Sequence, residues 1–363
     1  MIKLLVVDDS ALMRKLLGGI FAAEPDFEVS FARNGREALE LLPQVRPDVV
    51  TLDIHMPEMD GLACLDRIMI EHPCPVVMVS SLTAEGAEVT FEALELGAVD
   101  FVSKPSGAIS LEIDRLAPAI VEKVRLAAGT RVRKSLRLAE RVRARSGLAR
   151  SAPDRPPVTP APSPALVRRS GPSRRGLVLI GCSTGGPPAL DAVLSRLPAD
   201  FPWPVLVAQH MPATFTGALA QRLDRLCAVS VSELARPTPL LPGHVLIAKG
   251  DADAILSARP DGPVAMVAPS RPDYLWHPSV ERMVSSALDH LDPTRLVGIL
   301  MTGMGRDGAD AMTRLRHAGG RTIAESEDSA VVWGMPGELV KAGGAEFVAP
   351  ADAIAGRLLE LVG

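Results

Sequence analysis

The stretch Met1-Ile-Lys-Leu-Leu-Val-Val-Asp-Asp-Ser10 begins the chain with a short apolar run that ends in two acidic residues. The pattern repeats up to residue 105: short apolar runs alternate with stretches that carry apolar residues every three or four positions, as at Leu12, Leu16 and Ile20. Strands are predicted at 2–7, 28–31, 49–52, 76–80 and 99–102. Such alternation predicts an α/β fold with a doubly wound, five-stranded parallel sheet.

The same rhythm returns after residue 176. Apolar runs predict strands at 177–180, 205–208 and 296–301, each followed by a helical pattern. The middle of this region, 228–268, is rich in proline and glycine and predicts an antiparallel excursion from the sheet. We therefore expect a second doubly wound α/β domain in the C-terminal half.

The length of 363 residues fits two domains and a linker. Residues 151–172 contain seven prolines in 22 positions, a composition typical of an extended linker. The preceding stretch, 115–150, carries eleven basic residues and predicts a basic helix, which is either a solvated face leading into the tether or a docking surface. The predicted domains are 1–122 and 176–363, joined by a basic helical extension and proline-rich linker at 123–175.

Composition excludes several classes of protein. Hydrophobic residues make up 47% of the chain and charged residues 23%, as in folded domains. The net charge of −4 and the aromatic content of 3% do not favour nucleic-acid binding. No apolar run approaches the roughly 18 residues of a transmembrane helix, and acidic residues interrupt the N-terminus too early for a signal peptide. We expect no nucleic-acid partner, no membrane insertion and a cytoplasmic location.

The four cysteines fit that location. They are widely spaced and form no CxxC pair, so the sequence predicts neither a disulfide framework nor a zinc site; they are Cys64, Cys74, Cys182 and Cys227.

Polar residues follow the predicted strands of the first domain. Asp8 and Asp9 follow the first strand, Asp53 the third, Ser80 ends the fourth and Lys104 follows the fifth. Parallel strands bring these positions to one edge of the sheet. Three carboxylates gathered there repel one another unless a hard cation such as Mg²⁺ lies among them. With a hydroxyl and a lysine beside it, such a cluster suits phosphoryl transfer to Asp53.

Because of these polar residues and their spacing, positions 1 to about 122 resemble the flavodoxin-like receiver domain of two-component response regulators. The resemblance implies that Asp53 accepts the phosphoryl group and that Asp8 and Asp9 help to hold Mg²⁺. It also implies switch roles for Ser80, Lys104 and the aromatic residue Phe101. His55 departs from the family pattern, where an acidic residue is frequent.

A second set of polar residues follows the strands of the C-terminal half. Ser183 lies in Gly181-Cys-Ser-Thr-Gly185, a glycine-rich turn that satisfies the G-x-S-x-G pattern of a nucleophile elbow. His210 follows the strand at 205–208, and Asp307 lies in a glycine-punctuated loop after the strand at 296–301. A serine nucleophile, a histidine base and an orienting aspartate are the requirement for acyl transfer. The chain order Ser, His, Asp differs from that of α/β-hydrolases.

These residues and their surroundings resemble the catalytic domain of the chemotaxis protein-glutamate methylesterase family, CheB. The motifs that carry the resemblance are GCSTGGP, QHMPATFT, LPGHVLIAKGD, HPSVERM, LMTGMGRDGADAM and VVWGMP. The resemblance implies a Ser183–His210–Asp307 triad, with Thr184 and Met304 shaping the substrate and oxyanion region and no cofactor in this domain. It also implies an enzyme that is activated by phosphorylation and that demethylates and deamidates its substrates, the chemoreceptors. The implied phosphodonor is a chemotaxis histidine kinase.

Each of these residues also has a plainer reading. Ser183 could cap a helix, His210 could be a core histidine with satisfied hydrogen bonds, and Asp307 could be a helix N-cap. Cys182 departs from the family's alanine and is either a small buried residue or a second nucleophile. His277 stands where arginine is frequent, which could weaken contact with an acidic receptor segment or shift its pH dependence.

Two other functions remain open at this stage. A response regulator whose second domain only binds nucleic acid or protein predicts a compact helical or basic C-terminal domain, whereas residues 176–363 show repeated βα units. A generic serine esterase fused to a receiver differs from a receptor methylesterase only in its substrate.

Overall fold

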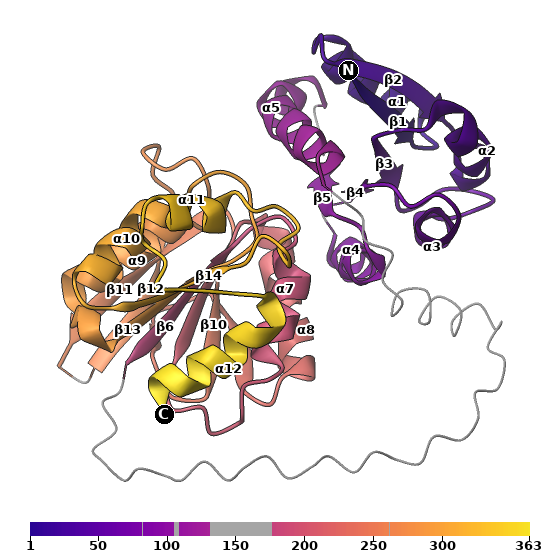
Figure 1. Ribbon diagram of the computed structural model, residues 1–363. Helices are drawn as coiled ribbons and strands as arrows, with labels where there is room; N and C mark the ends of the chain where they lie inside the picture. The colour runs from indigo at the N-terminus through magenta and orange to yellow at the C-terminus, as the bar shows by residue number, and fades with distance from the viewer. Residues whose placement is uncertain (82, 105–108, 131–175, 261) are drawn as a thin grey trace, which may run out of the picture.

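The computed structural model describes residues 1–81, 83–104, 109–130, 176–260 and 262–363. It forms two α/β domains, drawn from indigo to magenta and from rose to yellow in Figure 1. The expected fold class is confirmed for both domains.

The N-terminal domain, called the receiver domain after its sequence resemblance, contains five parallel strands in the order β2-β1-β3-β4-β5. Successive residues of β1 point to opposite faces: Leu4 and Val6 pack with α1 and α5, whereas Leu5 and Val7 pack with α2, α3 and α4. The elements are β1 (Ile2–Val7), α1 (Ala11–Ala22), β2 (Phe27–Ala32), α2 (Gly35–Val45), β3 (Val49–Asp53), α3 (Gly61–Glu71), β4 (Val76–Ser80), α4 (Ala84–Leu96), β5 (Asp100–Ser103) and α5 (Ile109–Ala128).

Side-chain caps define where the first four helices begin. The side chains of Ser10, Asn34, Asp60 and Thr83 each accept a hydrogen bond from the backbone N–H three residues later. These caps fix the loops that follow β1 and β3, where the acidic residues lie.

The C-terminal domain, called the catalytic domain after its sequence resemblance, is built on seven parallel strands in the order β15-β14-β13-β6-β7-β10-β8. Val178 and Ile180 of β6 pack with α7, α8 and α12, and Leu177 and Leu179 pack with α9, α10 and α11. Its elements are β6 (Leu177–Cys182), α7 (Gly186–Leu194), β7 (Val205–Gln209), α8 (Ala213–Leu226), β8 (Ser230–Leu234), β9 (Thr238–Pro239), β10 (His244–Ala248), β11 (Ala252–Arg259), β12 (Gly262–Pro269), α9 (Val280–His290), η1 (Pro293–Arg295), β13 (Leu296–Leu300), α10 (Ala309–His317), β14 (Arg321–Glu325), α11 (Met335–Lys341), β15 (Phe347–Ala349) and α12 (Ala351–Val362).

The antiparallel excursion is only partly as expected. β11 and β12 form an antiparallel hairpin, which β9 extends to a three-stranded sheet. However, β8 and β10, from the same stretch of chain, are parallel strands of the main sheet. The antiparallel excursion therefore consists of β9, β11 and β12 and does not include the whole stretch that the composition suggested.

The predicted boundary at residue 122 cuts through α5, which continues to Ala128. Lys123 forms an ion pair with Asp100, and Arg125 forms ion pairs with Glu24 and Asp26. These two basic residues therefore belong to the receiver rather than to the linker. The rest of the predicted linker, from 131 to 175, lies outside the described residues.

An apolar interface joins the two domains. Helix α4 packs against α7 and α8, and the buried apolar side chains on this side of both sheets form one continuous cluster. The ring of Phe215 on α8 lies 4.4 Å from that of Phe101 and 6.4 Å from that of Phe91, centroid to centroid. At the edge of the interface, Arg222 forms ion pairs with Asp191 of α7 and with the receiver's Glu95.

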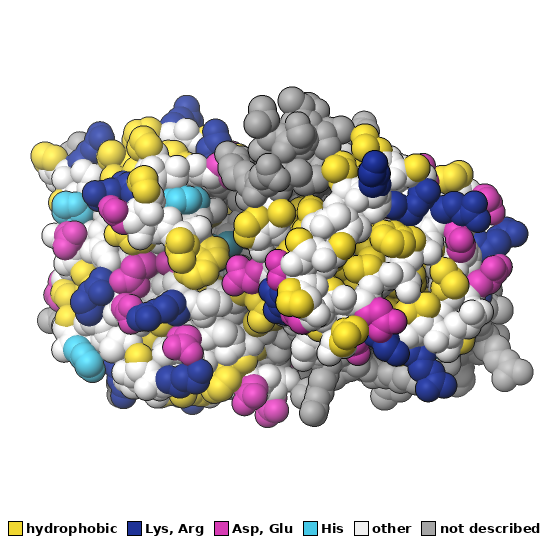
Figure 2. Space-filling view, turned by 90° about the horizontal axis from the view of Figure 1, so that it is seen from above, with side chains coloured by type: hydrophobic (Ala, Val, Ile, Leu, Met, Phe, Trp, Pro, Cys, Tyr) yellow, Lys and Arg dark blue, Asp and Glu magenta, His cyan; other side chains and the backbone are white. Residues whose placement is uncertain are grey.

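The distribution of charged side chains over the surface of the described residues agrees with the small net charge of −4. Basic and acidic side chains are interspersed over both lobes on the face shown in Figure 2. Among the described helices, none is both long and apolar enough to cross a bilayer.

Candidate functional site

Ser183 lies in the turn between β6 and α7. Its backbone N–H donates to the carbonyl of Thr302 (2.9 Å), and its carbonyl accepts from Gln209 Nε2 (2.9 Å). A Cβ on Gly303 would come within 2.7 Å of the Ser183 Cβ, so the neighbouring loop needs glycine there. The N-cap of α7 is Gly185, at φ 76°, so Ser183 does not cap this helix.

His210 follows the adjacent strand. Cys182 and Gln209 are partners in the β6–β7 ladder, and the His210 N–H donates to the Cys182 carbonyl (3.0 Å). Ser183 and His210 thus follow paired residues at the same edge of the sheet. Their side chains form no hydrogen bond with each other among the described interactions.

The imidazole of His210 is held through one nitrogen. Its Nε2 lies 2.8 Å from Asp307 Oδ2, whereas its Nδ1 is buried and has no hydrogen-bond partner. An ionised carboxylate requires a proton on Nε2, which leaves the lone pair of a neutral imidazole on Nδ1. The ring is therefore not a histidine with both nitrogens satisfied, and Nδ1 can accept a proton.

Asp307 lies in the loop before α10 and is held by the N-terminus of α9. Its oxygens accept hydrogen bonds from the backbone N–H groups of Val280 (2.7 Å) and Glu281 (3.0 Å), and from the Ser279 hydroxyl (3.1 Å). Burial by itself would raise the pKa of Asp307, but His210 and these donors outweigh it and hold the pKa below its usual value. The carboxylate thus stays ionised beside His210.

Sequence reasoning missed Trp276. Its ring is stacked on that of His210, with centroids 5.9 Å apart and planes inclined by 4°. Because an aromatic residue in a loop carries no motif, only the folded chain reveals this contact.

The other two residues expected around the nucleophile are buried. Met304 is 5% exposed and Thr184 is 4% exposed. The Thr184 hydroxyl donates to the carboxylate of Asp100, which belongs to the receiver. The residue next to Ser183 is therefore part of the domain interface.

Two of the three departures from the family pattern, Cys182 and His277, lie in the catalytic domain. Cys182 is fully buried, which raises the pKa of its thiol, and its Sγ lies 3.1 Å from Gln209 Oε1. A thiol that resists ionisation is a poor nucleophile, so the reading as a small buried residue holds. His277 contacts Asp253 through Nδ1, at 2.9 Å.

The acidic residues of the receiver meet as expected. Asp8, Asp9 and Asp53 each place a carboxylate oxygen within 4.8 Å of the others. Lys104 Nζ lies 2.7 Å from Asp53 and 3.3 Å from Asp8. Burial, and next the charge of Asp53, raise the pKa of Asp8. Three carboxylates with one nearby lysine form a hard, oxygen-rich donor set, which fits Mg²⁺.

The other two switch residues, Ser80 and Phe101, differ in their contacts. The Ser80 hydroxyl accepts from Thr90 Oγ1 (2.8 Å) and donates to the Gly86 carbonyl (3.2 Å), so it is bound to α4. Phe101 is buried, with Phe215 of the catalytic domain on its ring and Lys123 Nζ 5.2 Å from its centroid. The switch aromatic thus lies in the domain interface.

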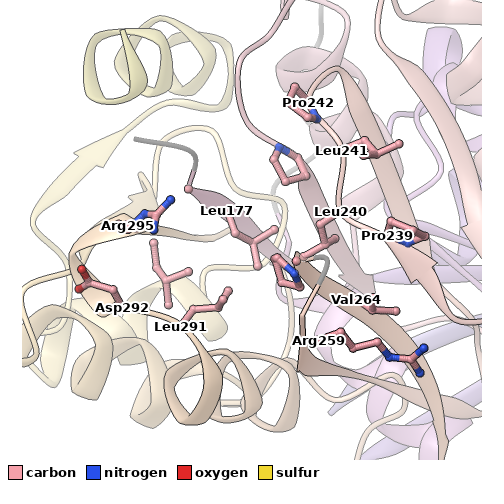
Figure 3. A pocket seen from close by; sticks show the side chains of 15 residues that line it. Leu177, Pro239, Leu240, Leu241, Pro242, Arg259, Val264, Leu291, Asp292 and Arg295 are labelled. Carbon is pink, nitrogen blue, oxygen red and sulfur yellow. The ribbon is translucent and has the colours of Figure 1, made fainter. Parts of the chain in front are cut away.

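A cavity of about 480 Å³ lies elsewhere in the catalytic domain. Figure 3 shows its apolar lining, which includes Leu177, Leu240, Leu291 and Val264. Leu177 begins β6, whereas Ser183 follows the other end of that strand. The cavity is therefore at the opposite edge of the sheet from the serine and is not the hydrolytic site.

Comparison with known families and structures agrees with this geometry. Residues 178–358 match the CheB methylesterase family, and residues 4–113 match the response regulator receiver domain. The crystal structure of the Thermotoga maritima CheB methylesterase catalytic domain superimposes with a TM-score of 0.50 at 36% identity, covering 51% of this chain and 98% of that one.

Two relatives are similar over nearly their whole length. A protein-glutamate methylesterase/protein-glutamine glutaminase 2 from Rhodopseudomonas palustris is 57% identical, over 99% of this chain and 98% of the relative. A protein-glutamate methylesterase/protein-glutamine glutaminase 3 from Rhodospirillum rubrum is 54% identical, over 99% and 95%. The chain therefore belongs to the CheB family of protein-glutamate methylesterases/protein-glutamine glutaminases, with a response regulator receiver domain preceding the methylesterase domain.

Proposed function

We propose that this chain demethylates glutamate methyl esters, and deamidates glutamines, on chemoreceptors in the cytoplasm, with Ser183, His210 and Asp307 as its catalytic triad. The observation that supports this most is the His210–Asp307 hydrogen bond through Nε2, which leaves Nδ1 unpaired on a residue that follows the strand paired with that of Ser183. In chymotrypsin the aspartate holds Nδ1 and Nε2 is the base. Here the two nitrogens exchange these roles: Asp307 binds Nε2, and Nδ1 is the proposed base.

In the first half-reaction the Ser183 hydroxyl attacks the ester carbonyl while its proton passes to Nδ1 of His210. A tetrahedral oxyanion forms close to the N-terminus of α7, which favours negative charge. The C–O bond to the methoxy group then breaks, His210 returns the proton, and methanol leaves.

In the second half-reaction water attacks the acyl-Ser183 ester, with His210 again accepting a proton. Ser183 leaves as the alcohol and the glutamate carboxylate is restored. Deamidation follows the same steps with ammonia as the leaving group, so it depends more strongly on proton donation by His210. Asp307 stabilises the imidazolium formed in each step.

In the receiver, Asp53 is the proposed phosphoryl acceptor and a chemotaxis histidine kinase the proposed donor. Asp8, Asp9 and Asp53 would hold Mg²⁺, which supplies positive charge to the transferred phosphoryl group. Lys104, 2.7 Å from Asp53, provides a second positive charge at the acceptor.

The domain interface provides a route for control. Asp100 and Phe101 follow each other in β5; one binds Thr184 beside the nucleophile and the other packs on α8. We infer that phosphorylation of Asp53, acting on Ser80, Lys104 and Phe101, weakens this docked state and opens the serine to substrate.

The assay that tests the proposal uses methylated chemoreceptor in membranes and the purified full-length chain. Methanol release that increases with a small phosphodonor such as acetyl phosphate is the expected result. Hydrolysis of small esters without methanol release from receptor would instead indicate a generic esterase, and no hydrolysis at all would indicate a binding domain.

Replacing Glu95 by glutamine should raise the demethylation rate of the unphosphorylated protein by about 1.4- to five-fold. The ion pair between Glu95 and Arg222 links the domains, and a partly exposed pair of this kind contributes about 0.2–1 kcal/mol. Methanol release without phosphodonor measures the effect.

The matched control is Glu88→Gln on the same helix. Glu88 also faces an arginine of α8, Arg225, but at 3.8 Å and with both side chains about two-thirds exposed. Its replacement should leave the basal rate unchanged. Equal rates for the two variants would contradict inhibition by the docked receiver.

A further inference from the structure

The first turn of α9 holds Asp307, so whatever fixes this turn also fixes the carboxylate that orients His210. We propose that Asp253, on β11, is a positioning residue for the triad. The proposal rests on the hydrolytic function inferred above and assigns a catalytic consequence to the antiparallel hairpin outside the main sheet.

Asp253 is buried, and donors on both sides of Ser279 bind its carboxylate. Oδ1 accepts from the Ser279 backbone N–H (2.8 Å) and from His277 Nδ1 (2.9 Å). Oδ2 accepts from Arg282 Nη1 (2.7 Å), and the same guanidinium nitrogen donates to the Pro269 carbonyl at the end of β12 (2.6 Å). The beginning of α9 is thus clamped to both strands of the hairpin.

One consequence runs through the backbone to Asp307. Asp253 binds the N–H of Ser279, and the next two N–H groups, of Val280 and Glu281, bind Asp307. The Ser279 hydroxyl binds Asp307 as well. Two buried carboxylates therefore share the start of one helix, and the first determines where the donors of the second lie.

A second consequence runs to the ring of His210. Asp253 holds His277, whose chain neighbour is Trp276, and Trp276 stacks on His210. Losing the Asp253 carboxylate would therefore release both the carboxylate and the aromatic face that orient the imidazole. Misplacing a catalytic group by about 1 Å can cost on the order of 100-fold in rate.

The test compares Asp253→Asn, Asp307→Asn and the double variant in the full-length chain. The asparagine amide would direct its N–H group toward Arg282 or His277. Both of these residues are donors, so a hydrogen bond would be lost and the turn would loosen. We expect kcat for methanol release to fall about 10- to 100-fold with KM unchanged. In the Asp307→Asn background the same replacement should cost less than it does in the parent chain, because the part of its effect that acts through the Asp307 carboxylate is already lost.

A matched control and an independent probe complete the design. Asp224→Asn replaces a carboxylate that also binds a backbone N–H, that of Val231 (2.8 Å), away from the triad; its kcat should be unchanged. Labelling of Ser183 by a fluorophosphonate, in which an Oγ–P bond forms and fluoride leaves, should slow in Asp253→Asn. This readout needs no receptor, so it separates failure of the positioning role from failure of the receptor substrate assignment.

A third variant covers the case in which Asp253→Asn does not fold. His277→Ala removes one donor from Asp253 and retains the Arg282 pair, so a smaller fall in kcat and in labelling rate is expected. Additive effects of Asp253→Asn and Asp307→Asn, or an unchanged kcat and labelling rate in a folded Asp253 or His277 variant, would overturn the proposal.

Discussion

Replacing Ser183 by alanine is expected to lower kcat for receptor demethylation by on the order of 10⁴-fold or more. Triad residues act as a unit, so loss of the nucleophile removes the acyl-enzyme route and leaves only the contribution of binding and oxyanion stabilisation. The small Ser183 side chain lies in a turn fixed by backbone hydrogen bonds to Thr302 and Gln209, which alanine retains. Methanol release from methylated receptor measures the loss.

Ser195→Ala serves as the control. This serine is the C-cap of α7, is exposed, and its hydroxyl donates to the carbonyl of Asp191 in that helix, so its removal should leave turnover unchanged. Both variants should still accept phosphate on the receiver. Near-normal turnover by the Ser183 variant would rule out the serine mechanism.

Replacing Asp53 by asparagine is expected to abolish labelling by a radioactive phosphodonor, a fall of at least roughly 100-fold. An amide oxygen is a far weaker nucleophile than a carboxylate, and the change also neutralises one of the three clustered carboxylates and removes the ion pair with Lys104. Phosphodonor should then no longer stimulate demethylation. The catalytic serine should remain reactive toward a fluorophosphonate.

Asp60→Asn on the same loop provides the comparison, because asparagine is also a good N-cap for α3. Labelling of this variant should match that of the parent protein, and chelation of Mg²⁺ should prevent labelling of both. Mg²⁺-dependent labelling of the Asp53 variant would place the acceptor elsewhere.

Much of the fold could be predicted from local sequence. Fully buried strands read as continuous apolar runs, so β3, β4, β6, β7 and β13 were located within two residues. The prediction for the antiparallel region was less accurate, because the pairing of β10 with both β7 and β8, and not a local pattern, places these strands in the main sheet. Strand pairing of this kind leaves no periodic signal.

The residues of the candidate site also differ in how far the sequence reveals them. Ser183 and His210 directly follow strands and Asp307 lies in the loop after β13, all in recognisable motifs, so the sequence could nominate them as candidates. By contrast, Trp276 and Asp253 act through contacts across the fold, and a lone tryptophan or aspartate in a sequence resembles any other. The role of Thr184 as an interface residue also depends on the position of the receiver, which its own motif does not encode.

The bond between Thr184 and Asp100 has a consequence for the substrate itself. Thermodynamic linkage requires that two events opposed by the same docked state assist each other. If the receiver must leave Thr184 before a receptor segment can enter, then a bound receptor segment must in turn favour the undocked receiver and its phosphorylation. The receptor would then be an effector of the enzyme that modifies it. Receptors with many methylated sites would bind more of this chain in the undocked state and so favour its phosphorylation.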